Sequence, residues 1–167
     1  YGDVWLLLRP LAYQSHPYKW ATIGKEISHI ENATMEDVKA FFHKHYLPNN
    51  AILTVAGDVE SKDIKTLAEQ WFGDIPSGKK TERNLPKEPQ QIKERRLEVT
   101  RDVPANAIYK AYHICEKKAD DYHATDLLSD VLGLGKSSRL YIALVKEQHL
   151  FSEINAFVSG SYDNGLL

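Results

Sequence analysis

The chain has 167 residues, of which 43% are hydrophobic and 26% are charged, a composition typical of a globular domain. The formal net charge of −2 provides no global positive field for nucleic acid or an acidic membrane surface, and no apolar run approaches the ~18 residues that span a bilayer. The single cysteine, Cys115, excludes an internal disulfide framework and a multi-cysteine metal site. We therefore expect no nucleic-acid partner and no membrane partner.

The first half of the chain predicts three helices and a strand. The apolar segment from Val4 to Gln14 indicates a helix that Pro10 kinks or breaks. A second helix starts after Thr34, which forms a capping box with Asp37, and its apolar residues recur at helical spacing. The run AILTVAG, residues 51–57, is typical of a buried strand. A third helix starts near Ser61, the predicted N-cap, and ends at Gly73, the predicted left-handed C-cap.

A proline-rich linker separates the two halves of the chain. Residues 74–91 contain three prolines and few large apolar side chains, so a domain boundary is expected there. Beyond it, alternating patterns predict strands over 95–103 and 107–114. Helices are expected over 120–132 and 138–148, and a final strand over 152–162. Because both ends of the chain fall within such elements, we expect an excerpt of a longer protein.

The stretch VLGLGKSSRL, residues 131–140, contains a Gly-Lys-Ser that resembles a phosphate-binding loop. That loop requires a glycine five positions before Gly135, where the chain has Asp130, and it follows a strand rather than a helix. The glycines fit a corner between two helices better, with Gly133 ending the first in the left-handed region and Ser137 or Ser138 capping the second. We therefore expect no nucleotide partner.

The residues alone contain no complete catalytic or metal-binding set. His43 and His45 point about 200° apart on a helix, so they cannot share a metal without partners from elsewhere in the chain. Neither H-E-x-x-H nor H-x-x-E-H occurs, and there is no G-x-S-x-G. His16 precedes a proline in an irregular loop, where a hydrogen bond to the backbone is its expected role. We predict no catalytic residue and no metal ligand in this chain.

The order of segments resembles the pitrilysin/insulinase family of zinc metallopeptidases, which includes processing peptidases. The resemblance rests on HPYKWATIG, then TMEDVKAFFHKHYLPNNAILTVAGDV and LAEQWFGDIPSG, and on DYHATDLLSDVLGLGKSSRLYIALVKEQHL and VSGSYDNGLL downstream. It implies an α+β fold of antiparallel sheets packed against helices. It also implies three parts: 1–78 as the C-terminal half of a first, zinc-type unit, 79–94 as a linker, and 95–167 as the N-terminal half of the following non-zinc unit.

The resemblance implies a function that the residues alone do not show. Active members hold zinc with an inverted H-x-x-E-H motif and a downstream glutamate, and the motif's own glutamate activates the attacking water. The parent protein is then a zinc endopeptidase that cleaves extended or unfolded peptides, with its zinc ligands upstream of Tyr1. This excerpt supplies the non-catalytic substrate-chamber portion and is expected to be inactive by itself. The alternative is a structural or partner subunit of the same family without zinc.

The resemblance also nominates two residues and a set of partners. SYDNG resembles the segment that carries a substrate-facing tyrosine in relatives, so Tyr162 is the candidate peptide-binding residue, although relatives commonly have threonine where Asn164 stands. A tyrosine that only packs on a strand is the alternative. Arg139, in SSRLY, is expected to be a structural anchor. The expected partners are a peptide substrate and either a second copy of the chain or a sister subunit of the family.

Overall fold

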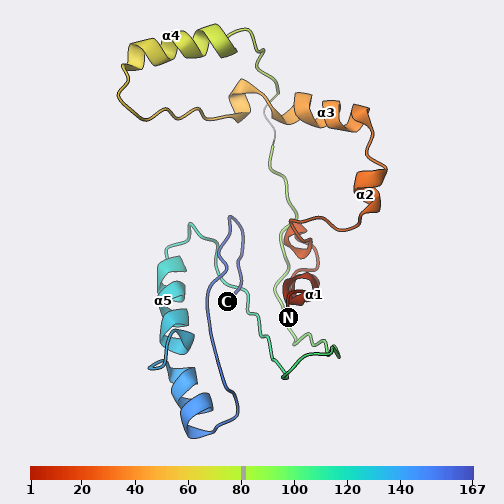
Figure 1. The fold of residues 1–167 in the computed structure, drawn as a ribbon, viewed down its shortest axis with the longest axis vertical. Coiled ribbons are helices and arrows are strands. Elements are labelled where there is room, and N and C mark those ends of the chain that lie inside the picture. Colours follow the sequence, from red (N-terminus) through yellow and green to blue (C-terminus); the bar gives the residue numbers. More distant parts are fainter. Residues whose placement is uncertain (80–81) are drawn as a thin grey trace. The chain divides into compact units, whose positions relative to one another are not determined.

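The computed structural model describes residues 1–79 and 82–167, in which short helices are joined by extended segments (Figure 1). The helical elements are, in chain order, α1 (Val4–Ala12), the 3₁₀ turn η1 (Pro17–Lys19), α2 (Ser28–Glu31), α3 (Met35–His45), the 3₁₀ turn η2 (Pro48–Asn50), α4 (Ser61–Phe72), α5 (Tyr122–Gly133) and the π-helix η3 (Tyr141–Glu147). They form two compact units. Residues 1–22 and 86–167 make up the first unit, and residues 23–85 make up the second. In the part of the chain that the structure describes, no helix is both long and apolar enough to cross a membrane.

The first unit has a small core at the C-terminal end of α1. Ala12, Tyr13 and Leu166 are buried there, and Tyr18 and Ala111 pack against them. Tyr13 and Tyr18 contact each other edge to face, with their ring centroids 5.6 Å apart. Aromatic pairs favour this arrangement. The core thus joins the segment after α1 to the C-terminal segment of the chain.

Backbone pairing places the C-terminal segment between two neighbours. Leu166 forms an antiparallel bridge with His113 on one side and with Ser159 on the other. Next to the first bridge, Tyr112 and Leu167 exchange two N–H···O bonds, each 2.9 Å long. Residues 159–167 therefore turn back on themselves, and the tip of this turn carries residues 161–164.

Helix α1 continues through Pro10 and ends two residues later. A helix C-terminus leaves carbonyl groups without partners and carries a partial negative charge. Nη1 of Arg95 donates to two of these carbonyls, Leu11 O at 2.6 Å and Ala12 O at 3.0 Å. The segment after the linker is thereby tied to the end of α1.

The second unit contains the predicted capping box at the start of α3. The Thr34 hydroxyl accepts a hydrogen bond from the backbone of Asp37, and the Asp37 carboxylate accepts one from the backbone of Thr34, so the prediction is confirmed. The hydrogen bonds from Thr34 hold the pKa of Asp37 below its usual value. Farther along this unit, the Asn49 side chain bonds to both the N–H and the carbonyl of Gly78, at 3.1 and 2.8 Å.

The expected α+β fold with antiparallel sheets is wrong for this structure. Among residues 1–79 and 82–167 no strand forms, and the sheet-like pairing consists of the two isolated bridges at Leu166. The described fold is therefore helical. A strand requires a neighbouring segment to complete its hydrogen-bond ladder. The predicted strands at 51–57 and 95–103 form no such ladder with any described segment. Apolar side chains of the first of these, such as Ile52 at 94% exposure, remain in contact with solvent.

The helix predictions are confirmed in position but not in every detail. Helices lie where the apolar spacing predicts them, although the last is a π-helix. Ser61 is the first residue of α4, and Glu60 takes the N-cap position. Gly73 is the C-cap of α4 but has a right-handed φ of −63°. Gly133 is the last residue of α5, but its φ is not left-handed. The left-handed glycine is Gly135, with a φ of +76°.

Candidate functional site

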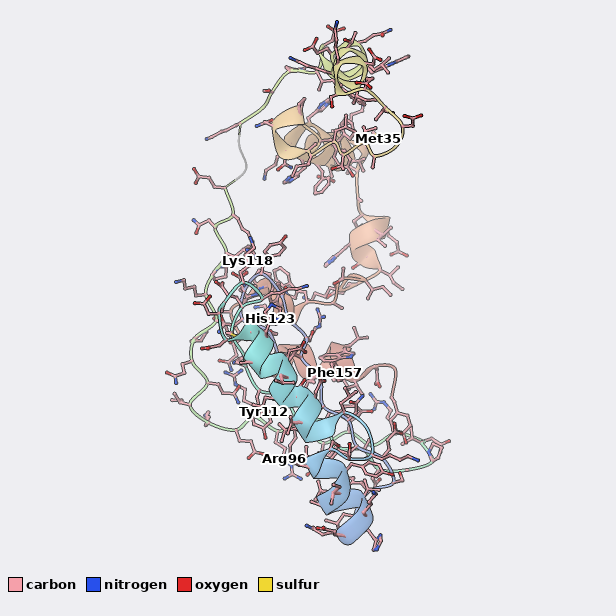
Figure 2. The ribbon with its side chains drawn as sticks, turned by 90° about the vertical axis from the view of Figure 1, so that its left-hand side faces the viewer. Met35, Arg96, Tyr112, Lys118, His123 and Phe157 are labelled. Atoms are coloured by element: carbon pink, nitrogen blue, oxygen red, sulfur yellow. The ribbon has the colours of Figure 1, made fainter. Side chains whose placement is uncertain are left out.

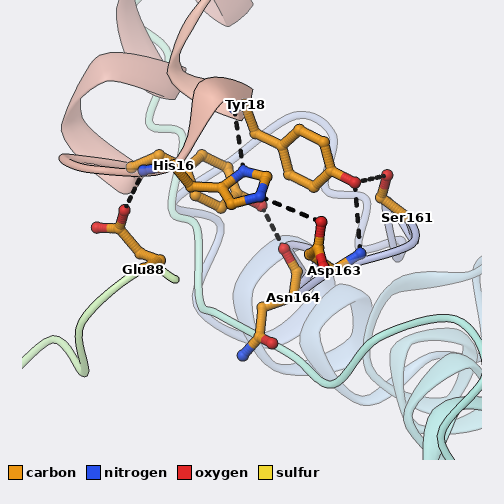
Figure 3. Close-up of polar contacts among 7 residues, drawn as sticks. His16, Tyr18, Glu88, Ser161, Asp163 and Asn164 are labelled. Atoms are coloured by element: carbon orange, nitrogen blue, oxygen red, sulfur yellow. Dashed lines mark hydrogen bonds and ion pairs between the residues drawn. The ribbon is translucent and has the colours of Figure 1, made fainter. Parts of the chain in front are cut away.

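A cluster of polar side chains joins three segments of the first unit (Figure 3). His16 and Tyr18 belong to the turn that follows α1, Glu88 lies within the predicted linker segment, and residues 161–164 form the C-terminal turn. Pro17 occupies the first position of η1, where its fixed φ and missing N–H fit a helical start. This local geometry aims the side chains on both sides of Pro17 at the C-terminal turn.

His16 is 3% exposed and links its own turn to Asp163. Its Nδ1 accepts a hydrogen bond from the backbone N–H of Tyr18, at 3.2 Å. A backbone N–H can only donate, so Nδ1 carries no proton and the proton of the neutral ring lies on Nε2. Nε2 therefore donates to Oδ2 of Asp163, 3.1 Å away. The backbone bond of His16 confirms its predicted role, while the bond to Asp163 was not predicted.

Two tyrosine hydroxyls hold the same C-terminal turn. The Tyr18 hydroxyl accepts from the Ser161 hydroxyl at 2.6 Å and from the backbone N–H of Asp163 at 3.3 Å. The Tyr13 hydroxyl donates to the carbonyl of Asn164 at 2.8 Å. Together with His16, these bonds fix the turn at three of its positions.

Glu88 closes the cluster on the other side. Its Oε1 accepts from the backbone N–H of Gln14 at 2.8 Å, and its Oε2 accepts from Ser15 at 2.8 Å and His16 at 2.9 Å. Desolvation alone would raise the pKa of this carboxyl, but the three backbone bonds and nearby His113 outweigh it and lower the pKa of Glu88 below its usual value. The carboxylate is thus held in its charged form against three successive amides.

Tyr13 is protonated in this environment well beyond neutral pH. Burial raises the pKa of Tyr13 to about 12 from its ordinary 10.0, Tyr18 adds to the rise, Arg9 opposes it, and Glu88 adds to it again. A hydroxyl that keeps its proton can keep donating to Asn164. The bond to the C-terminal turn is therefore present throughout the neutral range.

Replacing Tyr13 by phenylalanine should lower the free energy of unfolding of the full-length protein by about 1 kcal/mol at pH 7, because one part-buried hydrogen bond is lost. The folded pKa lies above the unfolded one, so the contribution of Tyr13 is complete below pH 10 and is lost as the pH rises from 10 towards about 12. Denaturant unfolding at pH 7 and at pH 11 measures both effects. Tyr109→Phe, at an exposed tyrosine, is the control; an equal loss in both variants would contradict the assignment.

Tyr162, the predicted peptide-binding residue, projects from the turn that this cluster holds. Its side chain is 68% exposed, and Nζ of Lys118 lies 5.5 Å from the centroid of its ring, within the range of a cation–π contact. Lys118 comes from the turn just before α5, near the labelled His123 (Figure 2). The location fits a ligand-contacting ring, and the peptide-binding role stays a prediction.

The other candidates lie outside the cluster or take part through their backbone. Arg139 is exposed and precedes η3. His43 and His45 lie on α3, where their rings contact Phe42 and Phe41 rather than each other. Asn164 joins the cluster through its carbonyl oxygen.

Sequence reasoning missed the pairing of His16 with Asp163 and the role of Glu88. The paired residues are 147 positions apart, and Glu88 is 72 positions from His16. Glu88 is one carboxylate in a segment that reads as a charged linker. No spacing rule connects residues so far apart, so no local signal was available.

Within residues 1–79 and 82–167, no three His, Cys, Asp or Glu side chains come close enough together to hold a metal ion. His16, Asp163 and Glu88 also use their polar atoms on each other or on backbone amides. The described residues therefore do not fit a zinc site, and we derive no catalytic step through zinc for this chain.

Residues 32–167 match the family described as the peptidase M16 inactive domain. Because this match covers most of the chain, the chain belongs to that family. The predicted resemblance to zinc metallopeptidases of the pitrilysin/insulinase type is thereby confirmed. The name of the matched domain agrees with the lack of a catalytic set in the sequence.

Similar proteins are named as proteases. The chain is 37% identical over 147 residues to the zinc protease PqqE of Helicobacter pylori. This match covers 85% of the chain and 32% of that protein. It is 25% identical over 170 residues to the probable mitochondrial-processing peptidase subunit beta of Schizosaccharomyces pombe, over 95% and 37% of the two chains. The crystal structure of a protease from Helicobacter pylori matches with a TM-score of 0.64 at 31% identity, over 99% of this chain and 40% of the other. The chain thus spans less than half the length of these relatives.

Proposed function

We propose that this chain is the non-catalytic substrate-chamber portion of a zinc-dependent endopeptidase that acts on extended or unfolded peptides. The observation that carries the proposal is the match of residues 32–167 to the inactive domain of a peptidase family whose similar members are named zinc proteases. The zinc ligands of the whole protein would then lie upstream of this chain. We also propose that residues 1–78 and 95–167 are halves of two successive family units. Residues 79–94 would then be the linker between them.

Within this function, Tyr162 is the proposed peptide contact. An exposed ring on a turn held at Ser161, Asp163 and Asn164 presents a large contact area at low entropic cost. Extended peptides bind largely through backbone hydrogen bonds with tolerance for sequence, and an aromatic ring adds apolar contact to such binding. Arg139 is proposed as a structural anchor beside the corner at Gly135.

A second candidate function is that of a partner subunit without its own zinc. It is favoured by the similarity to a protein named as a subunit of a processing peptidase. In that case the partner is a sister subunit of the family, or a second copy of the chain. Sedimentation of the full-length protein alone and with a candidate sister subunit separates a monomer from a dimer and from a mixed pair.

The test uses the full-length protein, with bound zinc and cleavage of a quenched unfolded peptide measured on the same sample. We expect one zinc per protein and cleavage that a chelator abolishes and added zinc restores, because zinc activates the attacking water in such enzymes. A folded protein with neither zinc nor cleavage would overturn the peptidase proposal in favour of the partner subunit. Cleavage that persists in the chelator with zinc removed would contradict both.

A further inference from the structure

The backbone around Tyr162 is held on both sides, although its ring is largely exposed. Ser161 precedes it and is bound to the Tyr18 hydroxyl, whereas Asp163 follows it and is bound both by His16 and by Tyr18. Figure 3 shows these bonds converging on the turn from the segment after α1. The turn is therefore positioned by side chains that are remote in sequence.

We propose that His16 and Asp163 form a positioning pair that orients the Tyr162 segment for peptide binding. The inference rests on the proposed function of Tyr162. His16 touches neither the peptide nor the reacting atoms in this assignment; it acts through Asp163. The His16 side chain is 4% exposed, against 37% for the Asp163 side chain, so the histidine is the fixed member of the pair and the aspartate is the member next to the exposed ring.

Glu88 extends this arrangement to the predicted linker segment. Its carboxylate accepts a hydrogen bond from the backbone N–H of His16. The residue that binds Asp163 through its ring is therefore itself held through its backbone. Side chains that are locked by a second layer of hydrogen bonds hold binding groups more accurately than isolated loops do. The position of Tyr162 thus depends on a chain of contacts from Glu88 through His16 to Asp163.

Two substitutions of His16 separate its two hydrogen bonds. His16→Asn retains an acceptor near the position of Nδ1, which faces Tyr18 N–H, but removes the donor to Asp163. His16→Gln retains an N–H donor near the position of Nε2 and removes the acceptor. His29→Asn, at an exposed histidine of α2, is the matched control for the loss of an imidazole ring.

The experiment measures kcat and KM for a quenched extended peptide with the full-length, zinc-loaded protein. We expect His16→Asn to raise KM about tenfold with kcat within about twofold, because the loss falls on binding common to ground state and transition state. His16→Gln should restore KM to within about threefold of the unsubstituted protein, and His29→Asn should leave both constants unchanged. In a Tyr162→Ala background, which itself raises KM, His16→Asn should add no further increase, because the two residues act as one unit.

Several outcomes would overturn the inference. An unchanged KM in His16→Asn would do so, and so would a lower kcat at constant KM, which reports only a smaller fraction of folded protein. If His16→Asn raised KM by the same factor in the native protein and in the Tyr162→Ala background, His16 would act elsewhere than through Tyr162. If His16→Asn does not fold, Asp163→Ala tests the same bond from its more exposed side, with the same expected rise in KM. An unsubstituted protein that binds zinc but cleaves no peptide would overturn the proposed function, and this inference with it.

Discussion

Replacing Glu88 by glutamine should lower the free energy of local opening at residues 14–16 by about 2 kcal/mol, since three hydrogen bonds to a charged carboxylate are disturbed. The amide offers one acceptor oxygen in place of two, and its NH₂ group turns a donor towards backbone N–H donors. Hydrogen exchange of residues 13–18 in the full-length protein measures this loss directly. The expected result is faster exchange of the amides that Glu88 holds, with little change in α4.

The same interaction has a defined pH dependence. The pKa of Glu88 is lower in the folded chain than its unperturbed 4.5, so the contribution is complete above pH 4.5 and is lost as the pH falls through the folded pKa. The difference in exchange between Glu88→Gln and the unsubstituted protein should therefore shrink below pH 4.5. Glu98→Gln is the control, because the ion pair of Glu98 with Arg96 is well exposed on both sides and contributes little. Equal protection in the Glu88 and Glu98 variants at pH 7 would contradict the assignment.

Replacing Gly133 by alanine should destabilise the protein by about 3 kcal/mol, because an added methyl group overpacks a site bounded by backbone. A Cβ at Gly133 would fall 2.2 Å from the backbone N of Ala156 and 2.5 Å from its Cβ. The end of α5 would have to move away from the segment that contains Phe157, whose ring contacts Trp5. Denaturant unfolding of the full-length protein, followed by tryptophan fluorescence, measures the loss.

Two other glycines separate this clash from general effects of the substitution. Gly135→Ala meets no atom within 4 Å but carries a φ of +76°, so about 1 kcal/mol of backbone strain is expected. Gly2→Ala has neither the clash nor the positive φ and should leave stability unchanged. The expected order of destabilisation is therefore Gly133, then Gly135, then Gly2. A Gly133 variant as stable as the Gly2 variant would show that α5 is free to shift.

Peptide cleavage by the whole protein and the presentation of Tyr162 by this chain are different parts of the same function. Zinc binding and peptide cleavage test what the whole protein does, while the kinetics of the His16 variants test how this chain presents Tyr162. The stability predictions at Glu88 and Gly133 depend on neither, because they follow from contacts within the first unit. A stable Glu88 contact without any cleavage would leave the described structure intact and change only its assigned role.

The sequence by itself determined the helices and the family. Apolar residues at helical spacing and the pairing of Thr34 with Asp37 lie within a few residues of each other, so local rules find α3, and they find α5 in the same way. The family resemblance likewise rests on contiguous phrases, among them the one that runs from Thr34 to Val59. Such signals need no knowledge of distant residues.

The tertiary structure alone decided the strands, the glycine roles and the polar cluster. The segment 51–57 has the composition of a strand, but a strand forms only when a neighbour completes its ladder, and no described segment does so. Gly133 is required by its close contact with Ala156 rather than by a left-handed turn. His16, Glu88 and Asp163 come together only because the turn after α1, the predicted linker segment and the C-terminal turn meet in the folded chain. Contacts across 72 and 147 positions leave no periodic trace in the sequence, since each partner satisfies only its own local geometry until the chain folds.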